Sequence, residues 1–166
     1  MKNFATNYLF SPGVATLISR AEHLVERLNH ADIRSEHLLT ELLRDLECQA
    51  IKVLVALGLD PEQCLAGLER VVLQKDFVPQ DFLWSAEAER VFLMAGKEAN
   101  RRPPDKAGEP NVIGDRELLI GFIRCGDGVA YEVLNRHGIY LNVLREKFGF
   151  PQDVWKRSLL VSSTPA

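Results

Sequence analysis

The 166-residue sequence has few cysteines, no excess of positive charge and no long apolar run. Cys48, Cys64 and Cys125 are odd in number and form no CxxC pair, which disfavours a disulfide framework or a zinc site and fits a reducing compartment. With 20 Lys and Arg against 23 Asp and Glu, the chain lacks the basic character of nucleic-acid-binding domains. No apolar run approaches the roughly 20 residues of a membrane span, and the N-terminus does not resemble a secretory signal. We therefore expect a soluble cytoplasmic domain that binds neither nucleic acid nor membrane.

Motifs for catalysis and nucleotide binding are also missing. There is no GxxxxGK[ST] loop, so this chain cannot bind and hydrolyse ATP in the Walker manner. No Ser-His-Asp order has a supporting nucleophile elbow, and no cysteine has a base at an activating spacing. His23, His30 and His37 fall seven residues apart, but the loop around 29–34 interrupts the helix between them. The sequence thus predicts no enzyme, no cofactor and no metal.

The strongly periodic segments all have helical spacing. Apolar residues follow i, i+3, i+4 spacing over 14–28, after Ser11 at the N-cap and Pro12 at the first helical position. Asp60-Pro61 repeats this pattern, and Gly58 ends the helix before it. No alternating stretch is long enough to need a sheet. We predict an all-α fold of about eight short helices.

The pattern of these helices is present twice. Phe10-Ser11 corresponds to Trp84-Ser85 at an offset of 74 positions, and from the second helix onward the offset is 80. Ser35 and Asp115 are expected to cap the second helix of each copy. A duplication of this kind predicts two four-helix repeats around a pseudo-twofold axis in a single domain. We place repeat one at 10–72, a linker at 73–83, repeat two at 84–148 and a C-terminal tail at 149–166.

The duplicated pattern resembles the N-terminal domain of the Clp/Hsp100 unfoldases, the Clp R or Clp N domain. The family pattern T-E-H-L-L at the second helix reads Ser35-Glu36-His37-Leu38-Leu39 here, and V-L-x-x-L-G-[VI]-D reads Val53-Leu54 with Leu57-Gly58-Leu59-Asp60. The likeness covers about 10–148. It implies a non-catalytic domain that recognises substrate polypeptides or adaptors for a Clp ATPase and its protease.

The resemblance leaves an alternative open. Some members of this kind are free-standing accessory subunits that dock on the Clp protease core or on the ATPase and regulate its assembly. A start at Met1 and the departures of both copies from the family pattern favour a free-standing member.

Candidate partner-binding residues lie where the two copies differ, at the start of the second helix. They are Ser35, Glu36 and His37 in the first copy and Asp115, Arg116 and Glu117 in the second. In some relatives the Glu of each copy holds the guanidinium of an arginine-phosphorylated substrate, while backbone N–H groups suit its phosphate. The resemblance therefore implies a cationic ligand for Glu36 and an anionic one for Arg116. The alternative is that both are solvated residues of a first helical turn.

The second copy also contains an insertion with three prolines and a glycine over 101–110. This composition predicts an exposed loop without regular structure. Arg101 and Arg102 begin the insertion, so they are further candidates for partner contact. The alternative is a tolerated surface insertion.

Overall fold

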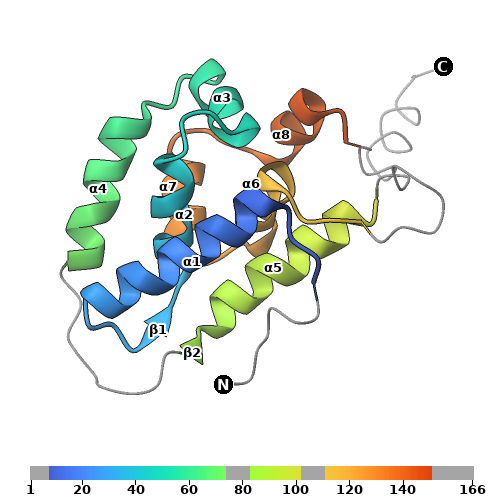
Figure 1. Cartoon of the computed structure of the whole chain (residues 1–166). Helices are drawn as coiled ribbons and strands as arrows, with labels where there is room; N and C mark the ends of the chain where they lie inside the picture. Colours follow the sequence, from blue (N-terminus) through green and yellow to red (C-terminus); the bar gives the residue numbers. More distant parts are fainter. Residues whose placement is uncertain (1–7, 74–82, 102–110, 151–166) are drawn as a thin grey trace, which may run out of the picture.

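The computed structural model describes residues 8–73, 83–101 and 111–150 (Figure 1). Within these ranges it contains eight helices, which confirms the all-α prediction. They are α1 (Pro12–Arg27), α2 (Ser35–Leu43), α3 (Gln49–Ala56), α4 (Pro61–Leu73), α5 (Ala86–Ala99), α6 (Asp115–Cys125), α7 (Gly128–Arg136) and α8 (Leu141–Phe148). None of these helices is long and apolar enough to cross a membrane. Most of the expected linker, insertion and tail lies outside the described residues, and the repeat boundaries stay a prediction.

Local sequence determines where several helices begin and end. The Ser11 side chain accepts a hydrogen bond from Val14 N at 3.2 Å, and Ser85 accepts one from Ala88 N at 3.1 Å. Gly58 follows α3 with φ +91°, a left-handed conformation that glycine adopts without strain. These ends match the sequence prediction.

The predicted caps of α2 and α6 were wrong. Ser35 and Asp115 are the first helical residues, and the cap positions are held by Arg34 and Gly114, whose backbones are extended. The Ser35 and Asp115 side chains are thus placed one position further along the helix. They are free to bond to groups outside it.

The two copies are joined by short backbone pairings before their helices. Two-residue strands β1 (Asp32–Ile33) and β2 (Leu83–Trp84) pair in parallel, and Phe10 forms an equivalent parallel bridge with Ile113. In each case the segment before one copy's first helix lies beside the segment before the other copy's second helix. This small parallel pairing is an addition to the predicted all-α fold.

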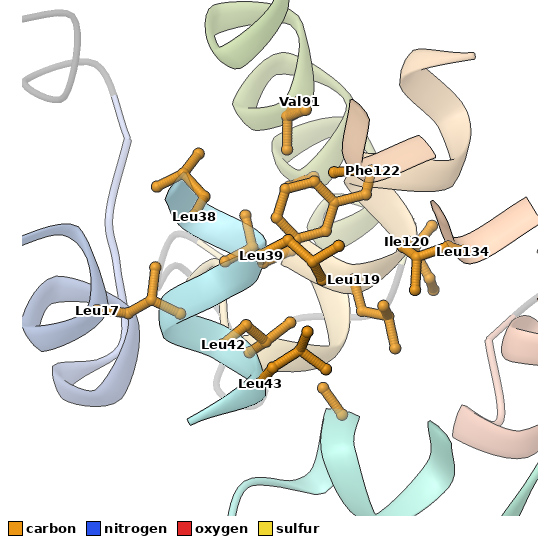
Figure 2. Close-up of a cluster of buried hydrophobic side chains, with 14 of the residues drawn as sticks. Leu17, Leu38, Leu39, Leu42, Leu43, Val91, Leu119, Ile120, Phe122 and Leu134 are labelled. Atoms are coloured by element: carbon orange, nitrogen blue, oxygen red, sulfur yellow. The ribbon is translucent and has the colours of Figure 1, made fainter. Parts of the chain in front are cut away.

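The copies share one hydrophobic core. Helix α1 packs on α2, α5 packs on α6, and α2 and α6 each also contact helices of the other copy. Figure 2 shows Leu39 of α2 close to Leu119 and Phe122 of α6, with Val91 of α5 beside them. All four side chains are fully buried. The apolar side chains of α2, α5 and α6 therefore belong to one core that both copies build.

Candidate binding site between the two copies

Most of the candidate residues at the start of α2 and α6 are inside the protein. The fully buried ones are Ser35, Glu36, His37 and Glu117. Asp115 and Arg116 are half-buried. Glu36 is thus not a solvated first-turn residue, and a partner reaches Asp115 and Arg116 more easily than the four buried side chains.

His37 and Glu117 perform the same structural task. Arg34 N donates to His37 Nδ1 at 3.0 Å, and Gly114 N donates to Glu117 Oε2 at 2.9 Å. Each side chain satisfies the backbone N–H just before its helix, as the third residue of a capping box does. The change from His to Glu between the copies therefore preserves a backbone contact.

The histidine spacing also has a structural explanation. Because His37 Nδ1 already accepts from the backbone, its Nε2 carries the proton and donates to His30 Nδ1 at 2.8 Å. His23 is exposed on α1. Within the described ranges, no three His, Cys, Asp or Glu side chains are grouped so that they could hold a metal ion.

Ser35 and Asp115 each cap a helix of the other copy. Ala130 N at the start of α7 donates to Ser35 Oγ at 3.3 Å, and Ala50 N at the start of α3 donates to Asp115 Oδ2 at 2.8 Å. The two contacts are related by the same offset of 80 positions. The first turns of α2 and α6 therefore fasten the copies together.

A cavity of about 230 Å³, the Gly13 slot, opens beside Asp115 between the first turns of α1 and α3. Its lining includes Ser11, Gly13, Asp45, Glu47, Cys48 and Asp115. Burial raises the pKa of the Cys48 thiol to about 11, and the charge of Asp115 contributes. The thiol is therefore neutral near pH 7, and the charges lining the slot are carboxylates.

The equivalent position in the other copy is filled. Gly13 corresponds to Glu87, whose carboxylate accepts a hydrogen bond from Ser35 Oγ. It also lies against the start of α7, because a Cβ on Gly128 would overlap the Glu87 carboxylate. The Glu87 side chain therefore fills the position in the second copy that corresponds to the open Gly13 slot in the first.

The filled position is electrostatically unfavourable for an ionised carboxyl group. Burial raises the pKa of Glu87, and the negative charges of Glu36 and Asp127 raise it further, while the hydrogen bond from Ser35 opposes the shift. The folded protein therefore binds the Glu87 proton more tightly than the unfolded chain does.

This shift predicts a pH-dependent effect of Glu87→Gln. As pH rises, Glu87 loses its proton in the unfolded chain first, near the ordinary pKa of 4.5, and in the folded protein only at a higher pH. The wild type therefore loses folding stability as pH rises through this range. Glutamine keeps the acceptor for Ser35 but does not ionise. Urea denaturation at pH 4 and pH 7 should show the variant gaining stability relative to wild type at the higher pH. Parallel pH profiles would contradict this assignment.

Arg101 belongs to a buried ion-pair network at the end of α5. Its Nε lies 3.9 Å from Glu98 Oε1. Glu98 also accepts from Arg145 at 2.7 and 2.9 Å and from Arg124 at 3.0 Å. Arg102 lies outside the described residues. The structure thus connects one of the two candidate arginines to the core of the second copy.

Sequence analysis missed this network, although the duplication contains a signal for it. Glu98 corresponds to Leu24 of the first copy, and Arg145 corresponds to Leu65. Two positions that are apolar in one copy and carry opposite charges in the other indicate that the two side chains are in contact. The difference between Gly13 and Glu87 could be found from the same alignment.

Comparisons with known proteins agree with this architecture. The family model of the Clp repeat (R) N-terminal domain matches residues 9–106. The negative regulator of genetic competence ClpC/MecB of Bacillus subtilis is 32% identical over 138 residues, which are 83% of this chain and 16% of that protein. The chain therefore spans about a sixth of the length of this curated relative.

Two solved structures have the same fold. The Hsp104 N-terminal domain from Candida albicans has a TM-score of 0.66 at 10% identity, over 84% of this chain and 88% of that chain. The N-terminal domain of ClpD from Arabidopsis thaliana has a TM-score of 0.56 at 19% identity, over 83% and 93%. With a family model that matches more than half of its length, the chain belongs to the Clp repeat (R) N-terminal domain family.

Proposed function

We propose that this chain is a non-catalytic protein-binding module that receives substrate or adaptor polypeptides for a Clp unfoldase and its protease. One observation carries the proposal: of two equivalent positions between the copies, one is filled by Glu87 and the other is open at Gly13. Relatives named as ClpC and as the chaperone protein ClpB support the connection to a Clp machine.

The charges around the Gly13 slot favour a basic side chain. Asp45 and Glu47 come from the segment between α2 and α3, and Asp115 comes from α6. Glu47 pairs with Lys52 at 3.3 Å, but its side chain is 92% exposed, so solvent screens that pair. An arginine in the slot would meet carboxylates from both copies and could pair with one of them through two hydrogen bonds.

The candidate residues then have two kinds of role. The buried side chains of Ser35, His37 and Glu117 hold the first turns of α2 and α6 in place through their hydrogen bonds, and Glu36 is buried beside them. Asp115 and Arg116 are the candidates for direct contact with the polypeptide, whereas Arg101 lies against the buried Glu98. Capture of a Clp ATPase with bound substrate would support delivery, whereas capture of a bare protease ring would support the accessory role.

Gly13→Glu is expected to abolish binding through the slot. The new side chain would fill the slot sterically, as Glu87 fills the other position, although its neighbour there is the Asp115 carboxylate and not a hydroxyl donor such as Ser35. A Cβ at this position meets only Ser11 Oγ at 3.9 Å. Fluorescence anisotropy measures the affinity of an unstructured peptide with one arginine for each protein. The peptide should bind to wild type about tenfold more tightly than it binds to the variant.

Two controls make this test specific. Gly67→Glu adds the same charge on α4, where a Cβ has no neighbour within 4 Å, and it should leave binding unchanged. A peptide with glutamine in place of arginine should bind wild type weakly. Equal binding of the arginine peptide to wild type and Gly13→Glu would refute the slot as the site.

A further inference from the structure

A second cavity, an open groove of about 440 Å³, lies between α3 and the start of α4. We call it the Val55 groove, and its lining includes Leu46, Ile51, Lys52, Val55, Asp60 and Glu62. Ile51 is fully buried, whereas Leu46 is 56% exposed and Val55 is 51% exposed. Two large apolar side chains thus remain in contact with solvent beside a buried one.

The fold does not require these exposed apolar side chains. Leu46 corresponds to Gly126 of the second copy, and Val55 corresponds to Asn135. The second copy forms the equivalent helices α7 and α8 with these two residues. Apolar side chains that line an open groove and that the fold does not need indicate a binding surface.

The charges around the two cavities indicate what kind of polypeptide fits them. Among the described residues that line the Gly13 slot and the Val55 groove, the charged ones are the carboxylates of Asp45, Glu47, Asp60, Glu62 and Asp115 and one cation, Lys52. Lys52 pairs with Glu47 at 3.3 Å. At three of these positions the second copy has an uncharged residue, namely Cys125, Tyr140 and Asn142. The combined surface therefore favours a segment that is both basic and apolar.

The slot and the groove are close enough for one short segment to occupy both. Cys48 lines the slot and Lys52 lines the groove, four residues further along at the start of α3. Four helical residues span about 6 Å along the axis. In an extended polypeptide, side chains two positions apart are on the same face and about 7 Å apart.

We propose that the Val55 groove binds a leucine-sized aliphatic side chain, two positions from the arginine that enters the Gly13 slot. Cavities of roughly 150 Å³ hold a benzene molecule, so the groove has room for such a side chain. The proposal deepens the proposed function, and it rests on that function for the polypeptide and its arginine.

Four unstructured peptides test this pairing by fluorescence anisotropy. Their centres read Arg-x-Leu, Arg-x-Ser, Gln-x-Leu and Gln-x-Ser, with small uncharged residues elsewhere, and a second set has the reverse order. Wild type should bind the peptide with arginine and leucine about tenfold more tightly than the one with arginine and serine. The reason is that binding removes the apolar surface of the leucine from water.

Variants then separate the groove from the slot. Val55→Asn introduces the residue of the second copy, and it should remove the advantage of leucine over serine and keep that of arginine over glutamine. Val71→Asn is the matched control on α4, where Val71 is 36% exposed and does not line the groove, and it should keep both advantages. Gly13→Glu should remove the advantage of arginine and keep that of leucine. Circular dichroism checks that each variant is folded.

Three results would overturn the proposal. They are equal binding of the leucine and serine peptides in both chain directions, a leucine advantage that persists in Val55→Asn, and a leucine advantage that Val71→Asn also removes. If Gly13→Glu keeps the arginine advantage while Val55→Asn removes that of leucine, the slot fails and the groove stands. Failure of the proposed function is therefore distinguishable from failure of this inference.

Discussion

Replacing Glu98 with leucine should destabilise the protein by about 3–5 kcal/mol, because the change leaves the Arg145 guanidinium buried without its carboxylate. Glu98 is fully buried and Arg145 is 2% exposed. The two side chains are joined by a pair of hydrogen bonds at 2.7 and 2.9 Å. Urea denaturation monitored by circular dichroism measures the loss directly.

The duplicated sequence supplies a rescue for this variant. The first copy has leucine at both corresponding positions, Leu24 and Leu65, and forms the same arrangement of helices. Replacing a buried ion pair by apolar residues is often neutral or stabilising, so Glu98→Leu with Arg145→Leu should recover most of the lost stability. A double variant as unstable as the single one would refute this explanation. Glu132→Leu, which breaks an exposed pair on α7, should cost little.

Gly121→Ala should cost about 1–3 kcal/mol, although alanine favours helices more than glycine does. A Cβ on Gly121 would stand 2.6 Å from the Val91 carbonyl oxygen and 3.0 Å from Ala95 Cβ. These atoms belong to α5, so the backbones of α5 and α6 would have to separate. The overpacking is therefore expected to exceed the gain in helix propensity.

A matched glycine gives the opposite expectation. Gly67 is in α4, and a Cβ there has no neighbour within 4 Å. Gly67→Ala should stabilise the protein by roughly 0.5–1 kcal/mol through the unfolded state. Thermal denaturation of the two variants should thus show shifts of opposite sign. Shifts in the same direction would contradict the close approach of α5 and α6.

Sequence reasoning predicted the features that depend on near neighbours. Ser11 caps α1 through a residue three positions away, and Gly58 ends α3 through its own backbone conformation. Helical periodicity identified the buried faces because the same residues repeat on one side of each helix. These elements need no knowledge of tertiary contacts.

The positions of the candidate site residues depend on contacts between segments far apart in the sequence, which a local sequence pattern does not reveal. Ser35 bonds to a residue 95 positions away, and Asp115 bonds to one 65 positions away. The resemblance pointed to Glu36, but burial between the copies removes this side chain from solvent. Comparing the two copies in the sequence does, however, show that Gly13 corresponds to Glu87.

The central claim is that the chain has two equivalent positions between its copies and that its own Glu87 fills one of them. Isothermal titration calorimetry with the arginine peptide tests it through stoichiometry. Wild type should bind one peptide. Glu87→Gly with Ser35→Asp, which gives the other position the glycine and the aspartate of the Gly13 slot, should bind two. A stoichiometry of one in the double variant, or of zero or two in wild type, would contradict the claim.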